Sequence, residues 1–277
     1  MFMGFIVLIG HIYGTVYGYG SDSVLFAFLF ALFSSFIGYF FSDKIALAVN
    51  GAKQISENDD PELFHVVESL ALTAGIPMPR IYIVNDPAPN AFATGRNPKH
   101  AAMAVTTGLR QIMTKSELEG VLAHELSHIS NYDVLFMTLV SVFVGTITML
   151  ADWFFRFSFL GGRRDDRDGR NINPIFMILG IVLIILSPII ATIIQLSISR
   201  KREFLADASG ALLTRYPEGL ASALEKIKAA SQPLRNANKA TAHMYIANPL
   251  KADSINKLFA THPPIEERIK VLRQMNI

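Results

Sequence analysis

Four long apolar stretches restrict the fold of this chain more than any other feature. They cover residues 2–19, 24–41, 134–155 and 175–198, and each is close to the roughly 20 residues that a helix needs to cross a bilayer core. Hydrophobic residues make up 51% of the sequence and charged residues only 17%, against about 25% charged residues in soluble proteins. The sequence therefore predicts an integral membrane protein with four helical spans.

The first span is expected to remain in the mature protein. No basic residue precedes it, no small-residue cleavage site follows it, and the second span begins after only residues 20–23. This pattern is not that of a cleaved signal peptide. Pro188 lies within the fourth span and is expected to kink it, which membrane helices tolerate.

The polar residues form two blocks, 43–133 and 200–277, that the third and fourth spans separate. We expect residues 1–42 to form two N-terminal transmembrane helices and residues 134–199 to form a transmembrane or membrane-embedded hairpin. An even number of crossings leaves both polar blocks on one side of the membrane, where they can fold as two halves of one domain. The predicted fold class is a membrane α-helical protein with a discontinuous α+β soluble domain.

Basic residues near the span ends predict that this domain faces the cytoplasm, because short cytoplasmic loops are enriched in Lys and Arg. Lys44 and Lys53 follow the second span and three basic residues at 200–202 follow the fourth, whereas the loop 20–23 has none. The loop 161–173 carries four arginines and opposes this bias. Either it crosses the membrane against the bias, or the third and fourth spans enter the membrane without crossing it.

The run H-E-L-S-H, from His124 to His128, is the strongest chemical signal in the chain. Residues four apart share one face of a helix, so both imidazoles can reach one metal ion while Glu125 addresses a bound water. The alternative is a helix whose histidines only pack or face water, but such a helix has no reason to place Glu between them. The run therefore predicts a zinc hydrolase.

The residues around this run are typical of a helix over 118–130. Ser116 is expected to be its N-cap, with Glu119 three residues later as in a capping box, and apolar residues recur at helical spacing. The same periodicity predicts further helices at 61–73, 218–228 and 265–275.

A third metal ligand must come from elsewhere in the chain, because catalytic zinc usually takes three protein ligands and leaves a fourth position to water. The sequence has no Cys, and no further His follows His128 at the spacing H-x-x-G-x-x-H, so a carboxylate is expected. Glu203 is the best candidate. Asp207, four residues later, shares its helical face and could hold a ligand imidazole. The segment 200–207 is equally typical of a charged amphipathic helix beside a membrane.

Two short β-rich segments, 80–85 and 100–107, are bounded by Pro or Gly and predict strands. Between them lies a run of small residues around one Phe, which consists of Asn90, Ala91, Phe92 and Ala93. Small residues let another backbone approach, so this run is a candidate edge strand that binds a peptide by strand addition. It is equally typical of a hairpin segment with a buried Phe92.

These motifs together resemble those of the HtpX-type membrane zinc metalloproteases, which are relatives of the CAAX prenyl endopeptidases. The resemblance covers essentially the whole chain and includes the layout of four spans. Its motifs are H-E-L-S-H at 124–128 with Asn131 and Asp133 behind it, E-F-L-A-D at 203–207, N-A-F-A-T-G at 90–95, and H-P-P at 262–264 with Arg268 and Ile269.

The resemblance implies a zincin-like metalloprotease domain with one zinc ion per chain. It assigns the zinc ligands to His124, His128 and Glu203, the catalytic carboxylate to Glu125, a carboxylate behind a ligand to Asp207, and charge-stabilising roles near the substrate to His262 and Arg268. The residue after Asn131 is commonly small in relatives but is Tyr132 here. We expect this departure to affect only the local packing before the third span.

The expected reaction is hydrolysis of a peptide bond. Zinc would lower the pKa of its bound water, Glu125 would accept the proton and return it to the leaving amine, and His262 would stabilise the oxyanion. The resemblance implies that the substrates are misfolded or damaged membrane proteins, cut on their cytoplasmic side as quality control during stress. It also implies a prokaryotic cytoplasmic (inner) membrane as the location.

Three other functions use similar residues. A non-haem iron oxygenase has two His and one carboxylate but gives Glu125 no role. A non-catalytic membrane assembly factor would use structural zinc, which normally has four protein ligands. A prenyl-protein endopeptidase differs in the architecture of its cavity, for which four spans are too few. The expected partners are protein or peptide substrates and the lipid bilayer, and the scattered basic residues with a net charge of +2 predict no nucleic-acid partner.

Overall fold

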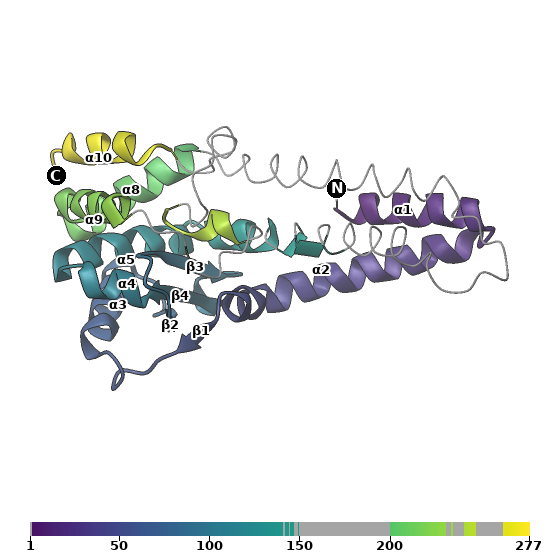
Figure 1. Ribbon diagram of the computed structural model, residues 1–277, viewed down its shortest axis with the longest axis horizontal. Helices are drawn as coiled ribbons and strands as arrows, with labels where there is room; N and C mark the ends of the chain where they lie inside the picture. Colours follow the sequence, from purple (N-terminus) through teal and green to yellow (C-terminus); the bar gives the residue numbers. More distant parts are fainter. Residues whose placement is uncertain are drawn as a thin grey trace. The chain divides into compact units, whose positions relative to one another are not determined.

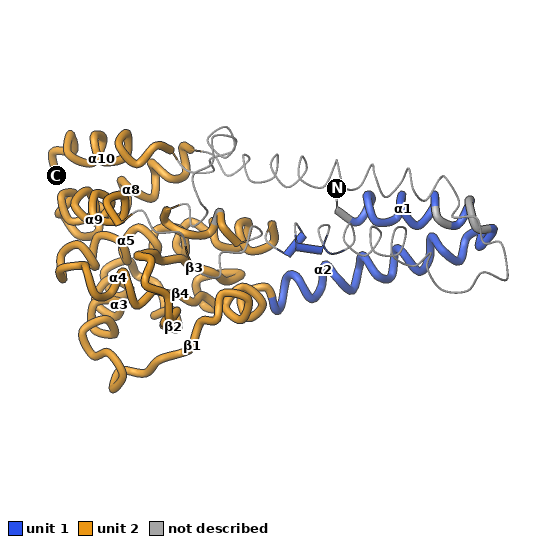
Figure 2. Tube along the Cα trace, in the orientation of Figure 1, with its two compact units in different colours: residues 1–41, 142–193 blue, residues 42–141, 194–277 orange. Residues whose placement is uncertain are grey.

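The computed structural model describes residues 2–140, 142–143, 145–146, 149, 200–230, 234, 241–247 and 263–277 (Figure 1). The chain divides into two compact units (Figure 2). Unit 1 comprises residues 1–41 and 142–193, and unit 2 comprises residues 42–141 and 194–277. Unit 2 is thus built from two separate stretches of sequence. The assignment of these stretches to membrane and soluble parts stays a prediction, because compactness does not show what surrounds a unit.

The described part of unit 1 consists mainly of α1 (Phe2–Tyr17) and the first part of α2 (Ser21–Val49). These helices coincide with the first two predicted spans. Of the described residues, only α2 forms a helix long and apolar enough to cross a membrane, while α1 holds a shorter apolar stretch, Met3–Ile12. The third predicted span is described only in part, and the fourth, 175–198, lies outside the described residues.

Unit 2 contains a four-stranded mixed sheet of described residues with the order β1-β2-β4-β3. Its strands are β1 (Ala52–Gln54), β2 (Arg80–Val84), β3 (Ala91–Gly95) and β4 (Ala101–Thr106). The two predicted strands are confirmed as β2 and β4, which pair in parallel, whereas β3 pairs with β4 in antiparallel register and lies at the edge of the sheet. β1, antiparallel to β2, has no sequence signal that predicts it.

Helices pack against this sheet and against one another, and together with the strands they form the core of unit 2 (Figure 1). They are α3 (Pro61–Ala74), α4 (Thr107–Ile112), α5 (Lys115–Ser130), α8 (Arg200–Thr214), α9 (Pro217–Ala230) and α10 (Ile265–Arg273), with short 3-10 turns η1 (Pro98–His100) and η3 (Ala242–Met244). The helices predicted near α3, α9 and α10 are confirmed. The left-handed Gly75 ends α3, as expected for a helix C-terminus.

The start of α5 differs from the prediction. Its N-cap is Thr114, two residues before the expected Ser116, and the capping box joins Thr114 to Glu117. The backbone N–H of Thr114 donates to Glu117 Oε2 at 2.7 Å, and Lys226 Nζ donates to the same oxygen at 2.6 Å. The buried Glu117 therefore has a tertiary partner in Lys226, and this contact favours the earlier start.

Two glycines let neighbouring helices approach α5 closely. A Cβ on Gly210 of α8 would lie 2.9 Å from the backbone nitrogen of His124, and a Cβ on Gly120 would lie 2.5 Å from the backbone nitrogen of Leu220. Real Cβ atoms do not come so near to backbone atoms. The absence of side chains at these positions therefore sets how close α8 and α9 lie to α5.

Candidate metal centre

His124 and His128 lie one turn apart on α5, and both are buried. Their rings are nearly perpendicular, with an interplanar angle of 89°, and their Nε2 atoms are 3.2 Å apart. The i, i+4 spacing of the sequence therefore brings two imidazole nitrogens to one point, as predicted.

Glu203 of α8 is the third residue at this point, and its side chain is 0% exposed. Its Oε1 lies 3.5 Å from His128 Nε2, and its Oε2 lies 3.8 Å from His124 Nε2. The three residues form a group whose candidate ligand atoms all lie within 4.8 Å of one another. Three ligands bound tetrahedrally at the usual zinc distances would be about 3.3 Å apart, so this donor set fits a zinc ion with little movement.

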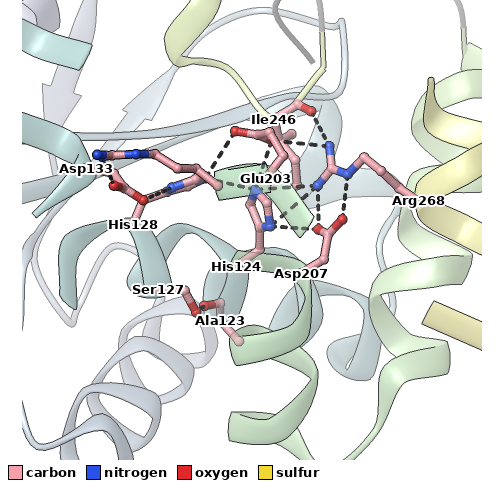
Figure 3. Close-up of polar contacts among 10 residues, drawn as sticks. Ala123, His124, Ser127, His128, Asp133, Glu203, Asp207, Ile246 and Arg268 are labelled. Atoms are coloured by element: carbon pink, nitrogen blue, oxygen red, sulfur yellow. Dashed lines mark hydrogen bonds and ion pairs between the residues drawn. The ribbon is translucent and has the colours of Figure 1, made fainter. Parts of the chain in front are cut away.

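A carboxylate lies behind each imidazole (Figure 3). His124 Nδ1 is 2.9 Å from Asp207 Oδ1, and His128 Nδ1 is 3.1 Å from Asp133 Oδ2. Such a partner on Nδ1 holds the proton there and leaves Nε2 free to bind a metal. Asp207 lies beside His124, where the sequence analysis expects it, and its supporting role stays a prediction. The contact of Asp133 was not predicted, because residues five apart do not face each other on a continuous helix.

Arg268 of α10 is fully buried and contacts Asp207 rather than an open surface (Figure 3). Its Nε donates to Asp207 Oδ2 at 2.8 Å and its Nη2 to Oδ1 at 2.7 Å, while Nη1 donates to the carbonyl oxygen of Ile246 at 3.1 Å. Nη1 also lies 3.8 Å from Glu203 Oε2. In this arrangement Arg268 supports the carboxylates of the site from behind.

The pKa values of the two histidines are shifted in opposite directions by their surroundings. Burial lowers the pKa of His124 to about 4, and the hydrogen bond to Asp207 only partly offsets it. Burial also lowers the pKa of His128, but the hydrogen bond to Asp133 and the charge of Glu203 outweigh it and raise the value to about 8. The protein neighbours thus favour a neutral His124, which is the form that binds metal.

Glu125 is buried beside the two histidines. Burial raises the pKa of its carboxyl to about 7, while the charge of His128 and a hydrogen bond from the backbone N–H of Ala93 lower it. A general base works best when its pKa lies near the operating pH. The surroundings of Glu125 therefore suit proton transfer at neutral pH.

The run at the start of β3 lies next to this centre, but part of its outer edge is covered by residues 244–247. Ile246 N–H donates to the carbonyl oxygen of Ala91 at 3.0 Å, and the side chain of Asn90 exchanges hydrogen bonds with the backbone of Ala247 at 2.9 and 3.3 Å. Phe92 is buried and packs against the ring of Tyr245, with centroids 4.8 Å apart. Asn90 and Phe92 thus bind residues 244–247 of the same chain.

The backbone N–H of Ala93, in β3, donates a hydrogen bond to Glu125. Every predicted site residue except His262 lies among the described residues. His262 lies outside the described residues, so its role stays a prediction.

The model of peptidase family M48 matches residues 57–276. Three relatives, each named Protease HtpX homolog, are similar over most of their lengths. The chain is 48% identical to that of Dictyoglomus turgidum, covering 92% of this chain and 83% of the relative. It is 47% identical to that of Caldanaerobacter subterraneus, covering 97% and 90%, and 49% identical to that of Pyrococcus furiosus, covering 98% and 91%.

A solved structure, that of S. mikatae Ste24p, has a similar fold. The TM-score is 0.55 at 19% sequence identity, and the match covers 98% of this chain and 62% of that structure. The chain therefore spans less than two thirds of the length of that solved protein, and the likeness concerns the fold alone.

Proposed function

The chain belongs to peptidase family M48, as a homologue of the protease HtpX, and on this premise we propose that it is a zinc-dependent membrane endopeptidase. The family makes it a metallopeptidase, and its metal site is formed by His124, His128 and Glu203. The proposal adds one zinc ion per chain, cleavage within protein substrates, and a place in the membrane.

The observation that carries the proposal is the buried group of three ligands with a further carboxylate, that of Glu125, beside it. His124, His128 and Glu203 converge at distances suited to one zinc ion, and their imidazoles are fixed by carboxylates on the far side. Glu125 is not one of the converging ligands, yet its shifted pKa suits a general base. A purely structural zinc site would have no use for such a group.

In the proposed reaction, bound zinc would supply Lewis acidity and an activated water. Glu125 would accept a proton at its carboxylate as the peptide carbonyl is attacked, and would then donate it to the leaving amine. Asp207 and Asp133 would keep the Nδ1 protons of the two imidazoles in place throughout. We propose that His262 adds a donor near the oxyanion and that Arg268 acts through Asp207.

The substrate is proposed to pair with the outer edge of β3. Along an antiparallel strand the backbone groups of alternate residues point to the same side. Asn90 O accepts from Thr106 N–H of the sheet, and Ala91 O accepts from Ile246 on the outer side, so the backbone groups of Ala93 point outward as well. The N–H of Ala93 already donates to Glu125, so we propose that a substrate strand binds at the carbonyl oxygen of Ala93, to which it would donate a backbone N–H. Asn90 and Phe92 would contribute indirectly, because they fix residues 244–247 beside the substrate-binding edge.

The proposed location is a prokaryotic cytoplasmic (inner) membrane, with unit 2 in the cytoplasm and four spans in the membrane. The long apolar helix α2 supports it, as do the basic residues that follow the second and fourth predicted spans. We propose that the substrates are misfolded or damaged membrane proteins, cut in quality control during stress.

The test is cleavage of a loosely folded protein, casein, by the detergent-purified full-length chain. Zinc is stripped and restored, and the wild type is compared with Glu125→Gln. Glu119→Gln on the same helix is the matched control. We expect zinc-dependent cleavage by the wild type and the control, and none by Glu125→Gln despite unchanged zinc binding. Zinc binding without cleavage by the wild type would favour a non-catalytic assembly factor.

A further inference from the structure

The two ligand histidines are supported in similar ways from different directions. Asp207 holds His124 from α8, the helix that also carries Glu203, whereas Asp133 holds His128 from the segment that follows α5 (Figure 3). The position of Asp133 is therefore not set by the helical geometry of α5 itself. It depends on the backbone conformation of the residues that directly follow α5.

A two-residue turn interrupts the helical conformation directly after α5. Asn131 is the C-cap, and Tyr132 follows in the left-handed conformation with φ 61°. The backbone N–H of Tyr132 donates to the carbonyl oxygen of Ile129 at 3.2 Å. This turn brings Asp133 back to His128, although a residue five positions later would point elsewhere on a continued helix.

Both oxygens of Asp133 have a cationic or imidazole partner. Oδ2 contacts His128 Nδ1, and Oδ1 accepts a hydrogen bond from Arg202 Nη1. The Asp133 side chain is only 7% exposed, whereas that of Arg202 is 47% exposed. The guanidinium of Arg202 also lies 5.9 Å from the ring centroid of Phe136. A buried carboxylate with two such partners is held in one orientation.

The arginine that contacts Asp133 differs from the one that contacts Asp207 in its exposure to solvent and in its distance along the sequence. Arg268, the partner of Asp207, is fully buried, so that arrangement is shielded from solvent. Arg202 lies 69 residues after Asp133, and the predicted membrane hairpin 134–199 falls between them. The ion pair thus joins the residue before this segment to a residue just after it.

We propose that Asp133 and Arg202 are positioning residues of the metal centre: Asp133 orients the His128 imidazole toward the metal, and Arg202 fixes Asp133. Because the pair joins the two ends of the segment 134–199, a displacement of either end changes the orientation of His128 and weakens metal binding. The inference rests on the proposed zinc site.

The experiment measures the dissociation constant for zinc of the metal-stripped, full-length protein in detergent, by competition with a chromophoric chelator. Asp133→Asn keeps the size of the side chain and removes its charge, and we expect zinc binding to weaken about 10-fold or more. Arg202→Gln should weaken it about threefold to tenfold, because that partner is half-exposed. Arg202→Lys should restore part of the loss. Arg110→Gln, which breaks the 2.7 Å ion pair with Asp60 in the same unit, is the matched control and should not change zinc binding.

The outcomes separate this inference from the proposed function. If the wild type binds no zinc, both are wrong. If the wild type binds zinc and both Asp133→Asn and Arg202→Gln bind it within twofold of the wild type, the zinc site stands and the positioning role is wrong. A merely structural pair would lower the melting temperature of the stripped protein without changing zinc affinity, which also overturns the inference. Should Asp133→Asn not fold, the comparison of Arg202→Gln with Arg202→Lys decides.

Discussion

Tyr132 has a left-handed backbone conformation in which its Cβ is sterically unfavourable. A φ of 61° costs a residue with a Cβ about 1 kcal/mol or more, whereas Gly adopts it freely. The side chain is 55% exposed, so little packing is lost on removing it. We expect Tyr132→Gly to stabilise the protein by up to about 1 kcal/mol, since the greater freedom of Gly in the unfolded chain offsets part of the gain. Thermal unfolding followed by circular dichroism measures this, and Tyr132→Ala, which keeps the Cβ, should show no gain.

Glu125 is expected to make the stability of the zinc-stripped protein depend on pH. Its folded pKa of about 7 lies above the ordinary value of 4.5, so the folded protein binds this proton more tightly than the unfolded chain does. The resulting stabilisation is complete below pH 4.5 and is lost as the pH rises through 7. Glu125→Gln cannot ionise, so it should exceed the wild type in stability by roughly 3 kcal/mol at pH 8 and by little at pH 4. Melting temperatures of both proteins across this range provide the measurement. A difference that stays constant with pH would contradict the assignment.

Among the elements, α8 depends on a glycine for its distance from the metal centre. A methyl group at Gly210 would press on the backbone of Ala123 and His124. We expect Gly210→Ala to move α8, and Glu203 with it, away from α5, at a cost of about 1–3 kcal/mol in stability and with weaker zinc binding. Chemical or thermal unfolding together with zinc titration tests this. Gly4→Ala in α1, where nothing lies within 4 Å of the added Cβ, is the control and should not destabilise the protein, because Ala favours a helix over Gly.

The elements that could be predicted from the sequence are those whose signals lie within a few neighbouring residues. Apolar periodicity and end signals predict α3, α9 and α10, and β-rich runs predict β2 and β4. The ligand helix is also predictable, although the local signals favour Ser116 as its N-cap where the structure has Thr114. Thr114 and Ser116 are both good N-caps, and Lys226, 109 residues from Glu117, adds the contact that no local signal contains.

Contacts between distant segments account for what could not be predicted. Residues 244–247 cover the outer edge of β3 through contacts such as that of Asn90 with Ala247, which are 157 residues apart. The support of His128 depends on the turn at Tyr132 and on Arg202. By contrast, His124 and His128 need only helical spacing to meet. Glu203 could be identified as a candidate by the requirement for a third ligand, but the resemblance to a family was needed to choose it over an ordinary charged helix.

At the scale of the whole molecule, the metal centre lies within one unit but uses both of its stretches of sequence. His124 and His128 come from residues 42–141, while Glu203, Asp207 and Arg268 come from residues 194–277. A metal ion bound by ligands from both stretches links them directly. Because it binds the folded protein and not the separated stretches, it stabilises their association by mass action.

We therefore expect zinc to protect both stretches of unit 2 from local opening. At a zinc concentration of 100 times the dissociation constant the added stability is about 2.7 kcal/mol. Hydrogen exchange of the detergent-purified protein should slow in α5 and α8 when zinc replaces the chelator, and should slow in α10 as well, because Arg268 is joined to Asp207. The exchange of α3, which supplies no ligand or supporting carboxylate, should change least. Glu203→Gln should remove the protection, since it leaves only the two histidines of α5 as ligands. Equal exchange with and without zinc in the wild type, despite measured binding, would mean that the protein's own contacts hold the two stretches together without a contribution from zinc.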